Sequence, residues 1–194
     1  MATSVWIQGL RPEENLKEAE AKWETTAEGC YIALTNDHLN VQNTMDKVRD
    51  PGAGAIVIFA GKPPPPPLFF TPLTTGATGT TRDSFDGKPV KELQYTSYHP
   101  RALRSMLAIA QALRTKHGLK GIAMVHRLGT VPIGEESILI AVSAPHRQAA
   151  WRAGEEALEE CKASVEVWKR EEFEGEEGVW RANRDGAVGQ REEV

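Results

Sequence analysis

What this chain has little of excludes several classes of protein. It contains only two cysteines, Cys30 and Cys161, which are far apart and have no second cysteine nearby. Neither a disulfide framework nor a zinc site is therefore indicated, and both thiols are expected to be reduced and partly buried. The histidines form no group with metal-ligand spacing, so we expect no metal and no cofactor.

Charge of one sign is not concentrated either. The formal net charge is −4, and no run of Lys and Arg has the length typical of a nucleic-acid or membrane-surface footprint. No apolar run approaches the roughly 20 residues that cross a bilayer, and the first residues lack the regions of a secretory signal. These absences predict a cytosolic protein that binds neither nucleic acid nor a membrane. Any anion site must be local.

The length and composition suit one domain with additions at both ends. With 194 residues and 40% hydrophobic content the chain can bury a substantial core. We expect a polar N-terminal extension over 1–27, a domain over 28–183 and a flexible charged tail over 184–194. Proline, threonine and glycine dominate 63–79, which predicts an inserted loop.

Apolar patterns predict alternating strands and helices. Strands are expected at Cys30–Leu34, Gly54–Gly61, Lys91–Tyr98, Ile122–Val125, Ser137–Val142, Val165–Lys169 and Gly178–Arg181. Helices are expected at Glu13–Glu24, from an Asn36-Asp37 cap to Val48, from Pro100 to a stop at Gly118, and from a Ser143 cap to about Lys162. The continuous apolar run of Gly54–Gly61 predicts a strand buried on both faces.

Three short motifs look like functional signatures but lack the required context. Gly52-Ala53-Gly54 precedes a strand, whereas a dinucleotide fingerprint joins a strand to a helix. Gly61-Lys62 lacks the upstream glycine and the following Ser/Thr of a phosphate-binding loop. Ser143 lacks the flanking glycines of a nucleophile elbow, so we expect it to cap a helix.

Cationic side chains gather at both ends of the helix expected after Ser143. His146 and Arg147 fall in its first turn, where free N–H groups and the helix dipole favour negative charge. They predict a bound phosphate or carboxylate. The alternative is that Glu135 or Glu136 pairs with Arg147.

Two lysines follow at the other end of this helix. Lys162 falls in the last turn and Lys169 in the next strand. Lys162 alone suits a surface lysine that complements the helix dipole, and Lys169 alone suits an edge-strand charge. Together with the nearby basic residues they favour an amine available for nucleophilic or base chemistry. The residues alone leave both interpretations open.

Five segments carry a family resemblance when they are taken together. They are Asp50–Ala55 with Phe59–Gly61, Arg82 before Asp86–Val90, Val125–Gly129, Ser143–Arg147 and Val167–Glu171. From about Cys30 to Asn183 the chain resembles the large, catalytic subunit of molybdopterin synthase, the MoaE family. The family pattern reaches its arginine within a few residues of the Phe-x-Gly strand end, whereas here 63–79 intervene before Arg82.

The resemblance implies a fold and an activity. The fold is α+β, an α/β-hammerhead in which helices pack on a mixed or antiparallel sheet within a single domain. The implied enzyme is a sulfurtransferase that moves sulfur from the C-terminal thiocarboxylate of a small ubiquitin-like subunit to cyclic pyranopterin monophosphate, which forms the dithiolene of molybdopterin. The implied assembly is a heterotetramer around a central homodimer of large subunits.

The resemblance also implies residue roles. Lys162 is similar to the active-site lysine near the thiocarboxylate, and Lys169 to a second essential lysine; both belong to the implied substrate-binding set. The other members of that set bind anions or flank the pocket: Arg82, His146, Arg147, Arg170 and Glu171.

Two alternatives to this enzyme remain open on the sequence. A non-catalytic dimeric scaffold that binds a ubiquitin-like partner would use the same basic residues, although the presence of both Lys162 and Lys169 favours the enzyme. A persulfide-carrying sulfurtransferase that uses Cys161 is disfavoured, because a cysteine inside a helical pattern is usually part of the core.

Overall fold

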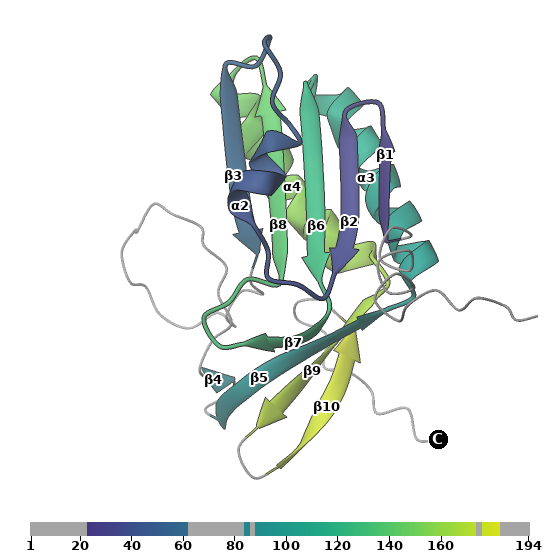
Figure 1. Ribbon diagram of the computed structural model, residues 1–194, viewed down its shortest axis with the longest axis vertical. Helices are drawn as coiled ribbons and strands as arrows, with labels where there is room; N and C mark the ends of the chain where they lie inside the picture. Colours follow the sequence, from purple (N-terminus) through teal and green to yellow (C-terminus); the bar gives the residue numbers. More distant parts are fainter. Residues whose placement is uncertain (1–22, 62–83, 86–87, 174–175, 183–194) are drawn as a thin grey trace, which may run out of the picture.

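The computed structural model describes residues 23–61, 84–85, 88–173 and 176–182. The inserted loop predicted at 63–79, the tail predicted at 184–194 and Arg82 lie outside these ranges. So does almost all of the helix predicted at Glu13–Glu24. Two sheets make up the described part, one above the other in Figure 1.

The first sheet is mixed and has five strands. In spatial order these are β1 (Glu24–Ala27), β2 (Cys30–Thr35), β6 (Gly121–Arg127), β8 (Ile138–Ala144) and β3 (Ala55–Gly61). β2 and β6 run parallel, and every other neighbouring pair is antiparallel.

The second sheet is antiparallel and lies at the lower end of the first (Figure 1). Its strands in spatial order are β10 (Glu176–Ala182), β9 (Val167–Phe173), β5 (Lys88–Ser97) and β4 (Ser84–Phe85), and β7 (Gly129–Pro132) also pairs with β5. β9 therefore lies inside this sheet, with β10 on one side and β5 on the other.

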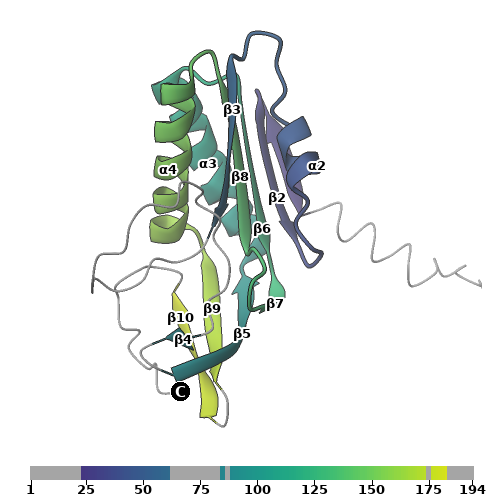
Figure 2. The same cartoon turned by 90° about the vertical axis from the view of Figure 1, so that its left-hand side faces the viewer.

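Helices cover both faces of the first sheet. The long helices α3 (His99–His117) and α4 (Arg147–Ser164) pack on one face, and the short α2 (Val41–Asp46) lies on the other (Figure 2). None of the helices in the described ranges is both long enough and apolar enough to span a bilayer.

The central strand β6 shows how the core is divided. Because successive strand residues point to opposite faces, Ile122 and Met124 enter the main core with α3 and α4, and both are fully buried. Ala123 instead joins a small cluster with Ala141 and Val48 on the α2 side. The predicted α+β class with a mixed sheet and packed helices is confirmed.

Most expected elements are present, with shifted ends. α3 ends as predicted at Gly118, which adopts the left-handed conformation with φ 63° that glycine tolerates best. The short strands β1, β4 and β7 have no counterpart among the predicted elements. β1 falls within the segment expected to be an N-terminal extension and pairs with β2 along its whole length.

Both predicted helix caps are wrong. Ser143 lies in β8 opposite Ile56, is fully buried, and its hydroxyl donates to Gly121 O at 3.5 Å. α4 begins after His146, which has no side-chain capping bond. α2 is capped by Asn40, whose side chain accepts from the Asn43 N–H at 2.9 Å. In each case strand pairing or loop geometry moves the helix start beyond the expected cap.

The expected burial of β3 on both faces is also wrong. β3 is the last strand of the first sheet in the described ranges and pairs there with β8 alone. Val57 and Phe59 point into the main core, whereas Ile56 and Ile58 are only partly buried on the α2 side. An apolar run therefore marked a strand correctly but not its place in the sheet.

Gly154 lies midway along α4, where Phe59 of β3 packs against the helix. A Cβ atom at this position would lie 2.0 Å from Phe59 Cε2, well inside contact distance. Such overpacking costs about 1–3 kcal/mol, against about 1 kcal/mol gained from the helix propensity of alanine. We therefore expect Gly154→Ala to lower the free energy of unfolding, as measured by urea denaturation. Phe59→Leu should reduce that loss, and an equal loss in both backgrounds would contradict this packing.

Candidate functional site

Lys162 is buried at the end of α4 that faces the second sheet. Only 8% of the residue is exposed, and its Nζ lies 3.6 Å from Glu159 Oε1 one turn earlier. Glu159 itself is mostly exposed. A lysine that only complemented the helix dipole would extend into solvent, so the surface interpretation of Lys162 is wrong.

Lys169 is buried in β9. Because β9 lies between β5 and β10, the interpretation of Lys169 as an edge-strand charge is also wrong. Its Nζ lies 3.6 Å from Glu171 Oε1, and both side chains are less than a tenth exposed. Glu171 Oε2 has no hydrogen-bond partner within the described ranges. Removing one member of such a buried pair leaves an uncompensated charge, at a cost of about 3–5 kcal/mol.

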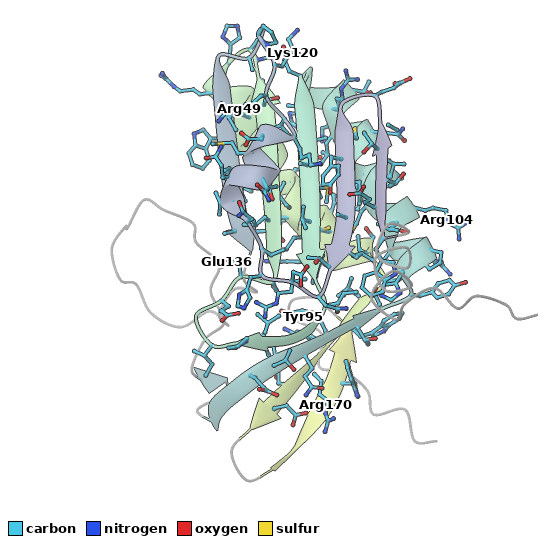
Figure 3. The ribbon with its side chains drawn as sticks, viewed as in Figure 1. Arg49, Tyr95, Arg104, Lys120, Glu136 and Arg170 are labelled. Atoms are coloured by element: carbon cyan, nitrogen blue, oxygen red, sulfur yellow. The ribbon has the colours of Figure 1, made fainter. Side chains whose placement is uncertain are left out.

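Register divides three predicted residues between the two faces of β9. Lys169 and Glu171 pair with Tyr95 and Leu93 of β5, both buried. Arg170 lies between them in sequence and therefore points to the other face, where its Nε lies 3.0 Å from Glu172 Oε1 (Figure 3). The structure brings Glu171 to Lys169 but turns Arg170 away from them.

His146 and Arg147 lie at the opposite end of α4 from Lys162. Fifteen residues separate Arg147 from Lys162 in one helix, a rise of about 22 Å. Both His146 and Arg147 are exposed. One chain therefore does not bring its α4 N-terminus to its own Lys162.

The alternative pairing of Arg147 with Glu135 or Glu136 is excluded by the sheet. Both glutamates precede β8 and Arg147 follows it, so the seven-residue strand separates them by about 20 Å. Glu135 instead forms an ion pair with Arg127 and lies 3.4 Å from His38 Nδ1.

The cysteines are buried and free, as expected. Burial raises the pKa of the Cys161 thiol to about 12 and also raises the pKa of Cys30. A thiol that stays protonated is a poor nucleophile, which weakens the persulfide alternative. Within the described ranges, no group of three His, Cys, Asp or Glu side chains is arranged to hold a metal.

Sequence reasoning did not single out His126 as a functional residue. It is 2% exposed in β6, and its Nδ1–H donates to Arg127 O at 2.8 Å, which leaves Nε2 as an acceptor. Within the described ranges Nε2 has no partner. The ring packs edge-on against Tyr95, with the centroids 5.2 Å apart. Tyr95 lies where the two sheets meet (Figure 3).

Burial lowers the pKa of His126 from 6.5 to about 4. The unfolded chain then binds a proton between these values that the folded chain does not, so stability falls as the pH falls from about 6.5 to 4. The difference corresponds to about 3 kcal/mol. Urea denaturation at pH 7.5 and pH 4.5 should show a larger acid loss for the wild type than for His126→Phe. An equal acid loss in the two proteins would show that His126 does not titrate this way.

Comparisons with known proteins show which family this chain resembles. The family model described as MoaE protein matches residues 74–164. A protein of Pyricularia oryzae named molybdopterin synthase catalytic subunit is 68% identical over 168 residues, which cover 87% of this chain and 82% of that protein. The chain belongs to the MoaE family.

Solved structures agree with this MoaE assignment. Molybdopterin synthase from Staphylococcus aureus superposes with a TM-score of 0.64 at 28% identity, covering 76% of this chain and 94% of that one. A complex of subunits 1 and 2 of molybdopterin-converting factor from Helicobacter pylori shares the fold, with a TM-score of 0.57 at 16% identity over 79% of this chain and 92% of that one. The predicted MoaE resemblance and hammerhead fold are confirmed.

Proposed function

We propose that this chain is the sulfur-transferring subunit of a molybdopterin synthase. In this reaction sulfur passes from the C-terminal thiocarboxylate of a small ubiquitin-like subunit to cyclic pyranopterin monophosphate, and the product carries the dithiolene of molybdopterin. The proposal includes a cytosolic location. The observation that carries it is the burial of Lys162 and Lys169, with Glu171, in a member of the MoaE family.

The lysines suit a reaction in which every participant is anionic. Ammonium groups held away from water stabilise a thiocarboxylate, a phosphate and the charge that develops during sulfur transfer more strongly than solvated ones. Glu171 limits the cost of burying Lys169 and holds its Nζ at 3.6 Å. Lys162 lies at the same distance from Glu159, whose carboxylate is largely exposed and therefore screened by water.

The helix N-terminus supplies the second half of the proposed site. Exposed N–H groups, His146 and Arg147 together favour a phosphate. A rise of about 22 Å along α4 is longer than a small fused-ring substrate, so these groups do not serve the same molecule as Lys162 of their own chain. In the proposed central homodimer, a two-fold axis brings the N-terminal end of α4 in one copy to the lysine end of the other, and the reverse.

The dimeric scaffold without catalysis is the second candidate. A scaffold requires exposed docking surfaces, but it gives no reason for two lysines and a glutamate to be nearly inaccessible. Burying charged groups costs free energy, and such groups are typical of catalytic sites. Burial of the lysines thus favours the enzyme.

A reconstituted reaction distinguishes the enzyme from the non-catalytic scaffold. The purified chain is mixed with a thiocarboxylated small subunit and cyclic pyranopterin monophosphate, and the dithiolene product is measured after oxidation to a fluorescent pterin. We expect product in proportion to the chain, and none when the small subunit carries an ordinary carboxylate. Tight binding of the small subunit with no product would establish the scaffold instead.

A further inference from the structure

One ring contact and one strand pairing connect the first sheet to the buried lysine of the second. His126 of β6 packs edge-on against Tyr95 of β5, with the rings inclined at 66°. Tyr95 is directly opposite Lys169 in the antiparallel register of β5 and β9, so their side chains share one face and their Cβ atoms lie about 5 Å apart. His126, Tyr95 and Lys169 are each less than a tenth exposed.

The imidazole of His126 is held in one orientation. Its Nδ1–H donates to Arg127 O, and the Arg127 guanidinium in turn donates to Thr130 O at 3.1 Å and pairs with Glu135. The corner between β6 and β7 therefore fixes the ring. Edge-to-face contact of two aromatic rings favours a defined relative position more than contact between aliphatic groups does.

The hydrogen bond to Arg127 O accounts for only one of the two ring nitrogens of His126. Nε2 is buried without a partner in the described ranges, and an unpaired polar atom in a core costs about 1–3 kcal/mol. The neighbours on the same face of β6, Ile122 and Met124, are apolar and fully buried. An aliphatic residue at position 126 would avoid the cost of burying Nε2 but would leave Arg127 O without this donor.

We propose that His126 is a positioning residue for Lys169 and acts through the ring of Tyr95. β9 pairs with β5 in the described ranges, and the contact between His126 and Tyr95 is one of those that join β5 to the first sheet. The inference rests on the proposed function for its catalytic meaning. Misplacement of a reacting group by about 1 Å costs up to about 100-fold in rate.

The kinetic test compares two replacements of His126. His126→Leu fills the core but removes the ring, whereas His126→Phe keeps a ring against Tyr95. We expect His126→Leu to lower kcat by about 10- to 100-fold with KM nearly unchanged, and His126→Phe to retain kcat within about threefold. Met124→Val, two residues away on the same core face, controls for loosening of the core and should leave kcat unchanged on the folded fraction.

A double-mutant cycle with Lys169→Ala tests the path. If His126 acts through Lys169, adding His126→Leu to Lys169→Ala should cause no further loss of kcat, because the two effects are not independent. Additive losses would overturn the proposal, as would full activity of His126→Leu in a chain that Lys169→Ala inactivates.

A second measurement does not depend on the proposed function. The rate at which a water-soluble amine-acylating reagent modifies Lys169, mapped by mass spectrometry, reports how firmly the amine is held. We expect His126→Leu to raise that rate several-fold, and His126→Phe and Met124→Val to leave it unchanged. An unchanged rate in His126→Leu overturns the positioning role even if the wild type makes no dithiolene. Loss of product in the wild type with the expected acylation pattern would instead overturn only the proposed reaction.

Discussion

Lys162→Ala should lower the turnover of sulfur transfer by about 100- to 1000-fold while the chain stays folded and still binds its small subunit. The buried ammonium is proposed to stabilise charge that develops on the reacting groups, and removal of one preorganised group of this kind typically costs that much. Its ion pair with Glu159, at 3.6 Å, involves a carboxylate that is 65% exposed. Loss of that pair therefore contributes little to stability. Single-turnover product formation with saturating thiocarboxylated subunit measures the effect.

Two further variants sharpen this test. Lys162→Arg keeps the charge but not the amine, and its wider guanidinium does not fit an ammonium site without rearrangement, so we expect it to fail nearly as badly. Lys116→Ala removes an exposed lysine that pairs with Glu156 and should leave turnover unchanged. Wild-type turnover in Lys162→Ala would remove Lys162 from the catalytic site.

The periodicity of apolar residues predicted the long elements of the fold. The 3.6-residue pattern through Leu103, Met106 and Ala110 predicted α3, and these residues are buried as expected. Two of the missed strands, Glu24–Ala27 and Gly129–Pro132, are four residues each and have no alternation of apolar and polar residues that would predict a strand. Each is paired with a longer strand, β2 or β5. Pairing over long sequence separations has little local signal.

The prediction of a helix cap at Ser143 was wrong for the same reason. Serine followed by a proline in the first turn is a favourable start for a helix, and Ser143 with Pro145 satisfies that local rule. Pairing of β8 with β3 continues through Ala144, opposite Ala55, and holds Ser143 in the strand. Tertiary pairing overrode a local preference of about 1 kcal/mol.

The family pattern selected these two lysines as candidates, but it did not predict their burial. A lysine in a last helical turn and a lysine in a short strand are usually exposed. Lys169 is buried because β9 lies between β5 and β10 and turns Lys169 to the face of the buried Tyr95 and Leu93, and this strand order has no signal in the local sequence. The separation of Arg147 from Lys162, in contrast, follows directly from the number of residues between them in one helix.

That separation leads to the prediction with the clearest outcome. Arg147→Ala and Lys162→Ala should each be inactive alone, and a mixed dimer of the two should regain activity. In such a dimer one site carries both replacements and the other carries neither, so random pairing of equal amounts restores about a quarter of wild-type activity. Co-expression with two affinity tags, followed by tandem purification and the dithiolene assay, isolates the mixed dimer directly.

The matched control mixes Lys162→Ala with Lys169→Ala. Both lysines belong to the same half of the proposed site, so each site of that mixed dimer lacks one of them and activity should stay absent. Recovery in the first mixture but not in the second would require Arg147 to act on the lysines of the other copy. Absence of recovery in both, with the mixed dimers intact by native mass spectrometry, would confine the site to one chain. Wild-type activity of Arg147→Ala alone would instead show that the N-terminus of α4, about 22 Å from Lys162 of its own chain, takes no part in sulfur transfer.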